Sequence, residues 1–320
     1  MVDPKYQPVD AATVPRFADV ATFMRTKRVD PCSDIDIGLV GVPFDIGLNY
    51  RSGPREAPSA VRHASRLIRM AHPTTNVEPY KLCNIADIGD APINPLNFDV
   101  SIQQIEDFFA NLKAMDIRPV TIGGDHTIPT PILRALAKDG PVGILQVDSH
   151  ADVMDTMCGT KINHATFMRR AIEENLVDPK RTVQLGLRGS RFVPEDIQFG
   201  YDQGFTMITF DDYEEMGRAA AIEKVKATLG SGPTYVTIDI DGLDPSFCPG
   251  TAVPEIGGIT PRDMQVILRS LMGVNVTGAD ICEVAPCYDP TGITSVTAAN
   301  LMFELTCIIA DAIANGTGKT

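Results

Sequence analysis

The sequence predicts an α/β protein with a largely parallel sheet, and three observations lead to this prediction. From residue 35 onward, short apolar segments alternate with longer segments of helical periodicity, which is the pattern of repeated strand–helix units. The segments 142–147 and 234–238 are largely apolar on both faces, as strands covered by helices on each side must be. No linker rich in Gly, Pro or Ser divides the 320 residues, so we expect a single main domain, 34–320, after an irregular arm, 1–33.

Each expected strand is a short run of apolar and β-branched residues, and each expected helix has apolar residues spaced to form one face. The strands are expected at residues 37–42, 84–88, 118–122, 142–147, 182–187, 206–209, 234–238 and 276–281. The helices are expected at 57–69, 100–114, 129–137, 167–175, 211–229, 261–271 and 297–314. Strands in this number fit either an open sheet with helices on both faces or a (β/α)₈ barrel, and periodicity does not separate the two.

The charge balance argues against two classes of partner. The chain has 28 Lys and Arg against 41 Asp and Glu, a formal net charge of −13. Nucleic acids and anionic membrane surfaces bind clustered basic residues, so we expect neither as a partner. The sequence opens with no basic-then-apolar leader and contains no uninterrupted apolar run of about 18 residues, the length that spans a membrane. The seven cysteines are scattered, without metal-binding or redox spacing, and we therefore expect a cytoplasmic protein.

Polar motifs follow three of the expected strands. Gly-Gly-Asp-His lies at residues 123–126, and Asp-Ser-His-Ala-Asp lies at 148–152. The longest motif, Asp-Ile-Asp-Gly-Leu-Asp-Pro, lies at 239–245. The carboxyl ends of parallel strands meet at one edge of a sheet and form its ligand crevice. We therefore expect the three motifs to lie together.

These motifs supply more ligands than one metal ion needs. The candidate ligands are His126, Asp148, His150, Asp152, Asp239 and Asp241. Carboxylates this close would raise one another's pKa values unless a cation lay among them, and a mixed imidazole–carboxylate set suits Mn, Zn, Fe, Co or Ni. We therefore expect a two-metal site with bridging carboxylates. An aspartate after a strand can also be a simple helix cap, but three such motifs in order favour metal binding; His63 and His72 are expected to have structural roles.

The motifs resemble those of the ureohydrolases, the family of arginases, agmatinases and guanidino-acid hydrolases. The resemblance rests on the three strand-end motifs and on shorter matches at 41–45, 163–164, 249–251 and 283–286. It extends from about residue 15 to the end of the chain. Pro-Arg-Phe-Ala at 15–18 and Phe-Met-Arg-Arg-Ala at 167–171 are most similar to the agmatinase and guanidinobutyrase branch.

This resemblance implies a three-layer fold around an open, mainly parallel, eight-stranded sheet. It also implies a binuclear centre of two divalent ions, usually Mn²⁺ and occasionally Ni²⁺. The ligands would be His126 and Asp152 for one ion, His150 and Asp241 for the other, and Asp148 and Asp239 for both. A hydroxide bridging the ions would attack the guanidinium carbon and release urea and an amine.

The family pattern further implies roles for residues around the centre. Asp152 would orient the hydroxide, His164 would help to protonate the leaving amine, and Glu283 would hold the guanidinium through charge-assisted hydrogen bonds. Asn163, beside His164, is expected among the substrate-binding residues. We also expect trimers or hexamers, formed by one chain or with a related second subunit.

Departures from the family pattern bear on the substrate. Met154 stands where a polar residue, often Asn, is usual, and methionine cannot bind a carboxylate or an ammonium group. Met157 and Cys158 would extend this apolar wall, so the tail of the substrate is expected to be less polar than that of arginine. Arg191 either meets a substrate carboxylate or lies in solvent, and the sequence leaves both alternatives open.

The favoured interpretation is a metal-dependent hydrolase of a small guanidino compound such as guanidinobutyrate, guanidinopropionate or agmatine. An alternative is a hydrolase of an alkylated guanide or a metformin-like biguanide, which an apolar wall would favour. Another enzyme class, deacetylases of a related α/β fold, would use a single metal ion. Several of the six candidate ligands would then have no metal to bind, which disfavours this alternative. A scaffold or regulatory subunit of a hetero-oligomeric ureohydrolase should have lost some metal or shuttle residues, whereas this sequence retains all of them.

Overall fold

An eight-stranded sheet forms the middle layer of the structure, a computed structural model that describes residues 2–316. Its strands are β1 (Ile37–Gly41), β2 (Ile85–Asp90), β3 (Arg118–Ile122), β4 (Val142–Val147), β5 (Val177–Leu187), β6 (Thr206–Thr209), β7 (Thr234–Asp239) and β8 (Val276–Cys282). Their order is β2-β1-β3-β8-β7-β4-β5-β6, and each neighbouring pair is parallel. Within the described residues β2 and β6 are edge strands, so the sheet is open and the barrel alternative is wrong.

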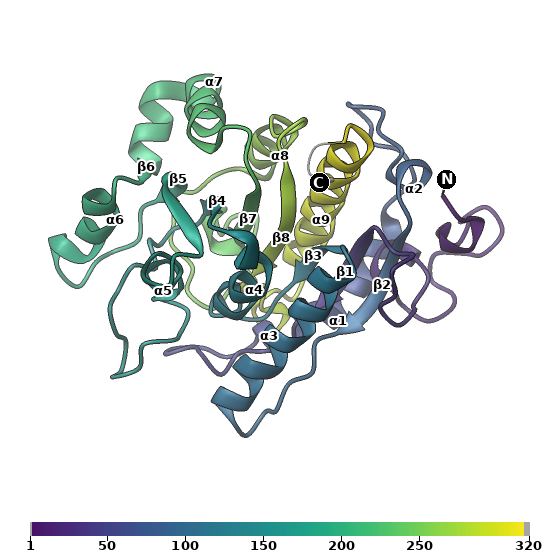
Figure 1. Ribbon diagram of the computed structural model, residues 1–320, viewed down its shortest axis with the longest axis horizontal. Coiled ribbons are helices and arrows are strands. Elements are labelled where there is room, and N and C mark those ends of the chain that lie inside the picture. The colour runs from purple at the N-terminus through teal and green to yellow at the C-terminus, as the bar shows by residue number, and fades with distance from the viewer. Residues whose placement is uncertain (1, 317–320) are drawn as a thin grey trace.

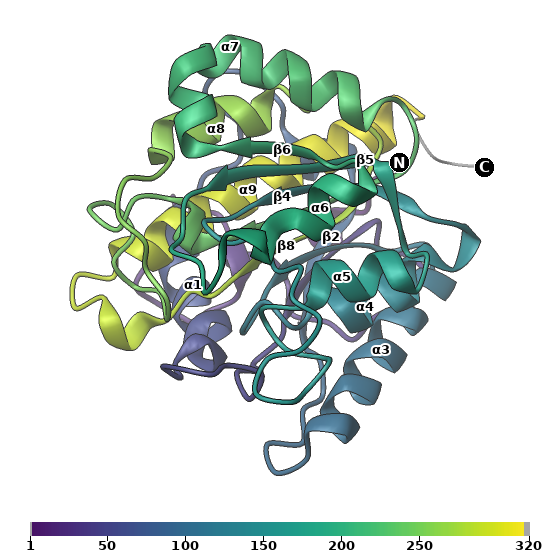
Figure 2. The same cartoon turned by 90° about the vertical axis from the view of Figure 1, so that its left-hand side faces the viewer.

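Helices cover both faces of this sheet (Figures 1 and 2). They are α1 (Ala57–Ala64), α2 (Pro79–Leu82), α3 (Phe98–Ala114), α4 (Pro129–Leu136), α5 (Phe167–Glu173), α6 (Gln198–Gln203), α7 (Phe210–Leu229), α8 (Pro261–Arg269) and α9 (Ile293–Ala314). Apolar side chains of α1, α7, α8 and α9 pack on one face, and those of α3, α4 and α5 pack on the other. The fold is therefore the three-layer arrangement that the sequence predicts.

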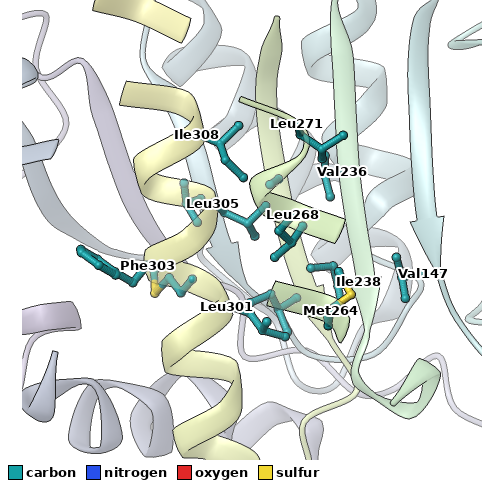
Figure 3. Packing of buried hydrophobic residues seen from close by; sticks show 14 of the residues in the cluster. Val147, Val236, Ile238, Met264, Leu268, Leu271, Leu301, Phe303, Leu305 and Ile308 are labelled. Carbon is teal, nitrogen blue, oxygen red and sulfur yellow. The ribbon is translucent and has the colours of Figure 1, made fainter. Parts of the chain in front are cut away.

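The central strand β7 shows how burial divides between the two faces. Val236 and Ile238 are fully buried and pack with Leu268 of α8 and with Leu301 and Leu305 of α9 (Figure 3). Each such side chain contributes about 1.5–3 kcal/mol by leaving water. Because successive residues of a strand point to opposite faces, the intervening polar residues of β7 point away from this core, toward the layer of α3, α4 and α5.

Helix α9 is long and apolar enough to cross a membrane by composition alone, with a mean hydropathy of 1.6 over its most apolar window. However, 78% of that window is buried inside the structure. The helix lies across the middle of one sheet face, against β8 and β3 and beside α1 and α8. This burial shows α9 to be the core helix of an α/β domain.

The structure differs from the sequence-based expectations mainly at element ends. Strand β5 begins at Val177 rather than at residue 182, because the Asp178-Pro179 pair suggests a turn but lies within the strand. Helices α2 and α6 were not expected, since both are shorter than two turns. The arm 2–33 is irregular apart from two 3₁₀ turns, and its Phe23 is buried in the core beside α1.

Candidate metal centre

Four adjacent strands bring the predicted motifs to one edge of the sheet. The order β3-β8-β7-β4 places the ends of these strands side by side, and a polar motif follows three of them while Glu283 follows β8. The turn after β3 requires glycine at position 124, because a Cβ there would lie 1.5 Å from the carbonyl oxygen of Phe44. The expectation that these motifs lie together is confirmed by their geometry.

One group of ligands surrounds Nδ1 of His126. This atom lies 3.0 Å from Oδ2 of Asp148, 3.0 Å from Oδ2 of Asp152 and 3.3 Å from Oδ2 of Asp239. The imidazole and the three carboxylates are each at most 8% exposed. The arrangement brings one nitrogen and three oxygens within reach of a single ion.

A second group surrounds Nδ1 of His150 and shares Asp148 with the first. The nitrogen lies 3.2 Å from Oδ2 of Asp241 and 3.6 Å from Oδ1 of Asp148. Asp241 is held by Ser149, whose hydroxyl and backbone N–H both donate to its Oδ1. The shared carboxylate of Asp148 makes two neighbouring ions the natural occupancy, whereas the bridging role of Asp239 stays a prediction, since its Oδ1 accepts the backbone N–H of Asp241.

The charges of the two groups do not balance without a cation. Within residues 2–316, none of the four carboxylates forms an ion pair with Lys or Arg. Buried Nδ1 of His126 makes no hydrogen bond although three carboxylate oxygens face it. An unpartnered buried polar atom costs about 1–3 kcal/mol, so this nitrogen and its neighbours fit a metal ion better than they fit one another.

The pKa values show the same imbalance. Burial, reinforced by repulsion from neighbouring carboxylates, raises the pKa of Asp239 well above its usual range and that of Asp152 to about 7. Burial also opposes ionisation of Asp148, but the neighbouring imidazoles of His126 and His150 hold the pKa of this shared carboxyl below its usual range. Bound cations would favour the ionised form of all these groups.

A cavity of about 480 Å³ opens onto this centre and is lined by His150, Asp152 and His164. Its apolar wall includes Met154, as expected for a substrate-contacting residue, together with Leu187. Asp152 is held in the left-handed region with φ of 52°, a strained conformation for this residue and one that often marks functional sites.

The residues around His164 divide into two roles. Its Nε2 lies 3.0 Å from Oδ1 of Asn49, another residue of the cavity wall, and burial lowers the pKa of the imidazole to about 4. Asn163 is only 4% exposed and does not line the cavity. Its side chain donates to Thr160 and accepts from the N–H of Ala165, so it supports the loop carrying His164 and is misplaced among the expected substrate contacts.

Arg191 lines the cavity, whereas Glu283 is buried and is not among the residues that line it. Arg191 lines the mouth of the cavity, is exposed, and donates to the carbonyl oxygen of Pro194. Glu283 is 2% exposed and accepts the N–H of His126 through Oε1, while its Oε2 makes no hydrogen bond. Burial, together with the charges of Asp239 and Asp125, raises the pKa of Glu283 well above its usual range.

Sequence reasoning missed several polar residues that support the ligands from within the strands. Nε2 of Gln146 donates to Oδ2 of Asp148, and Oγ1 of Thr237 contacts Nε2 of His126 and donates to Asp280. These residues could have been noticed because a polar side chain inside a fully buried strand is rare without a partner. They precede the strand-end motifs and are not part of them.

Comparison with known proteins gives a consistent result. The model of the arginase family matches residues 35–307. The chain is 42% identical to a guanidinopropionase of Pseudomonas aeruginosa, over 96% of this chain and 97% of that protein. It is also 42% identical to a guanidinobutyrase of the same species, over 95% and 97%. The structure of proclavaminate amidino hydrolase from Streptomyces clavuligerus superposes with a TM-score of 0.90 at 33% identity, over 93% of this chain and 99% of that one.

Proposed function

The chain belongs to the arginase family, and from this premise we propose that it is a binuclear-metal amidinohydrolase. In this reaction a guanidino C–N bond is hydrolysed to urea and an amine. The observation that carries the proposal is the set of two imidazoles and four carboxylates at one edge of the sheet, all buried except the partly exposed His150, with no Lys or Arg paired to it in residues 2–316. Related hydrolases named for guanidino substrates, at 42% identity, support the same reaction class.

The ligand set fits two divalent ions. His126, Asp152 and Asp239 would hold one ion and His150 and Asp241 the other, while Asp148 would bind both. Two cations bound there lower the pKa of water toward neutrality and stabilise charge that develops on the attacked group. We propose Mn²⁺, with Ni²⁺ as the alternative, because imidazole with carboxylate suits both. Elemental analysis should find about two ions per chain; one ion or none in an active preparation would contradict the proposal.

Three residues of this chain would handle the substrate and its protons. Asp152, at the inner end of the cavity, would accept a hydrogen bond from the attacking water and orient it. His164, neutral above about pH 4, would relay a proton to the leaving nitrogen by accepting at one ring nitrogen and donating from the other. Glu283 would bind the guanidinium through Oε2, the oxygen without a partner in the protein.

We propose guanidinobutyrate, guanidinopropionate or agmatine as the substrate class. Arg191 at the mouth of the cavity supports the two acids, because only one of its nitrogens donates to Pro194 and the rest of the guanidinium is available to a carboxylate. Arginine should be a poor substrate, since Met154 offers no partner for a second polar group on the tail, and an unpaired buried charge costs several kcal/mol.

The second candidate, an alkylated guanide or biguanide, is favoured by the composition of the cavity wall. Among the described residues, nine apolar side chains line it: Ala151, Val153, Met154, Met157, Ala165, Leu187, Phe192, Ile197 and Val253. Such a wall would bind short alkyl groups on a guanidine nitrogen, at about 0.8 kcal/mol for each buried methylene.

Release of the amine product, with urea measured beside it, from a panel of compounds separates these candidates. We expect the highest kcat/KM with guanidinobutyrate or guanidinopropionate, and Arg191→Ala should then raise KM with less effect on kcat. If a dimethylated biguanide ranks first instead, the second candidate is correct, and Met154→Asn should shift preference back toward polar tails. Arginine ranking first would contradict the inference from the apolar wall.

Assembly and location complete the proposal. We propose a trimer or hexamer, of one chain or with a related subunit; light scattering that gives a mass near 34.6 kDa would contradict it. Thiols such as those of Cys158, Cys248 and Cys282 form no disulfide, which supports a reducing compartment such as the cytoplasm. We further propose that residues 34–320 form the catalytic domain and that 1–33 is an arm attached to it.

A further inference from the structure

A line of buried polar side chains leads from His126 into the sheet, on the side away from the carboxylates. Nε2 of His126 lies 2.8 Å from Oγ1 of Thr237, and this hydroxyl donates to Oδ1 of Asp280 at 2.6 Å. The hydroxyl of Tyr235 donates to the other oxygen, Oδ2, at 2.5 Å. All four residues are at most 1% exposed, so water cannot replace any of these contacts.

Strand pairing holds this line in place. Thr237 of β7 is paired in register with Asp280 of β8, so the two side chains lie next to each other on one face of the sheet. Tyr235 is two residues before Thr237 and therefore points to the same face. The line is part of the middle layer of the fold, and its geometry does not depend on a loop.

Counting protons along the line fixes its direction. A threonine hydroxyl has one hydrogen to donate, and that hydrogen goes to Asp280. Toward His126 the same hydroxyl can therefore only accept, so Nε2 must carry a hydrogen. An uncharged imidazole has one N–H, and consequently Nδ1 presents its lone pair to the space between the carboxylates of Asp148, Asp152 and Asp239.

We propose that Asp280, acting through Thr237, is a positioning residue that fixes the tautomer of His126 so that Nδ1 is free to bind a metal ion. This inference rests on the proposed function, because it concerns the ion that His126 would hold. If His126 is an imidazolium in the metal-free protein, a binding ion displaces the hydrogen on Nδ1. The hydrogen on Nε2 is retained because Thr237 accepts it, so the metal-bound imidazole has the same tautomer.

The cost of burying Asp280 supports a role of this kind. Its carboxylate forms no ion pair within residues 2–316, and its partners there are neutral donors, including the thiol of Cys282. An unpaired carboxylate in a fully buried strand opposes folding. His126, Asp280 and Cys282 are close enough to hold a cation themselves, but the hydrogen bonds of Thr237 already join His126 to Asp280.

His150 provides an internal contrast. Its Nδ1 faces the second group of ligands, and its Nε2 lies 3.8 Å from a carboxylate oxygen of Glu255. That distance is too long for a hydrogen bond. The line of side chains from Asp280 therefore reaches only the ion that His126 would hold, and a change to Asp280 should affect the two ions unequally.

The decisive variants differ by one hydroxyl group. Thr237→Val removes the group that links His126 to Asp280, whereas Thr237→Ser retains it. Tyr235→Phe removes a hydroxyl bonded to the same carboxylate but outside the path to His126. Asp280→Asn replaces one of the two accepting oxygens by an N–H₂ donor and removes the charge that attracts the hydrogen of the Thr237 hydroxyl.

The experiment counts Mn²⁺ per chain and measures its affinity by competition with a chelator, with circular dichroism as a check on folding. We expect Thr237→Val and Asp280→Asn to weaken one of the two ions by about 10–100-fold, the usual effect of losing such a partner. Thr237→Ser should bind both ions like the wild type, and Tyr235→Phe should change either affinity by less than about threefold.

Other outcomes would overturn the inference. Equal losses in Thr237→Val and Tyr235→Phe would show that Asp280 serves stability alone. Wild-type affinity in Thr237→Val would exclude the positioning role of Asp280 while leaving the proposed function intact, whereas a wild-type protein that binds no Mn²⁺ or Ni²⁺ would overturn both. If Asp280→Asn does not fold, the Thr237→Val and Thr237→Ser pair still decides the question.

Discussion

Two buried clusters of histidine and carboxylate in this protein have opposite requirements. His72 and His126 are each 1% exposed. In the first cluster, Nδ1 of His72 accepts two backbone N–H groups, Nε2 contacts Glu304 at 2.8 Å, and Arg269 pairs with the same carboxylate at 2.5 Å. Every lone pair and charge there has a partner within the protein.

The centre around His126 uses the same residue types but leaves an imidazole lone pair facing three carboxylates without a cationic side chain. The difference shows that residue composition does not define a metal site. What defines it is a deficit of positive charge and hydrogen-bond donors, which an ion can supply. The following experiments test this distinction, from the largest expected effect to the smallest.

Removing the shared ligand should abolish the centre. Asp148→Asn withdraws one charge from both ligand groups, so we expect fewer than one ion per chain. Loss of several kcal/mol of metal-supplied stabilisation corresponds to a decrease in urea formation of about 10⁴-fold or more. Elemental analysis and a urea assay measure both effects; a variant that keeps two ions would show that the carboxylate is not a shared ligand.

Changing the nearby histidine that is not a ligand should separate metal binding from turnover. His164→Asn leaves both ligand groups complete, so metal content should match the wild type. Turnover should fall by about 10²–10⁴-fold, the usual contribution of a positioned proton donor. Full activity, or loss of an ion, would assign His164 a different role.

Breaking the cluster of His72, Glu304 and Arg269 should lower the stability of the protein and leave the metal centre intact. Glu304→Gln leaves the mostly buried guanidinium of Arg269 without its counterion, which should lower the free energy of unfolding by about 3 kcal/mol. Denaturant titration measures this loss, and metal content at low denaturant serves as the control. A fall in metal content would mean that the two clusters are not independent.

The smallest effect concerns pH. In the metal-free protein, burial and the charge of Asp148 raise the pKa of Asp152 to about 7. Burial opposes protonation of His126, but the carboxylates of Asp148, Asp152 and Asp239 raise the pKa of its imidazole above the usual range. Below pH 7 an entering ion must displace these protons, so its affinity should fall by about tenfold per pH unit for each proton released. Competition titrations at pH 5.5, 6.5 and 7.5 test this trend, and a constant affinity would contradict the pKa values.

The sequence predicts the strand ends better than the strand interiors. His126, Asp148 and Asp239 follow apolar strands, so each is identifiable from local pattern and the family resemblance. Thr237 and Asp280 act within strands, and their alignment depends on the pairing of β7 with β8. No local pattern reveals that pairing, because the two strands are separated by helix α8 and connecting loops.

The same limit applies to the fold and the cavity. Alternating strands and helices indicate an α/β protein, but the strand order, which leaves β2 and β6 as edges among the described residues, is what excludes a barrel. Asn163 was expected near substrate because it precedes His164, yet three hydrogen bonds turn its side chain into its own loop. Sequence neighbours on a loop can point in different directions, and periodicity does not predict which.

The strand order also has a consequence for biosynthesis. Because β8 separates β3 from β7, the edge that bears the ligands is incomplete until residues 276–282 have left the ribosome, when most of the chain already exists. Domains tend to fold as units during translation, so the acidic turns that follow the paired strands β4 and β7 can meet before the turn that carries His126 joins them. The site that would capture the ions is therefore completed only at the closing step, when β8 brings His126 and Glu283 to the four carboxylates.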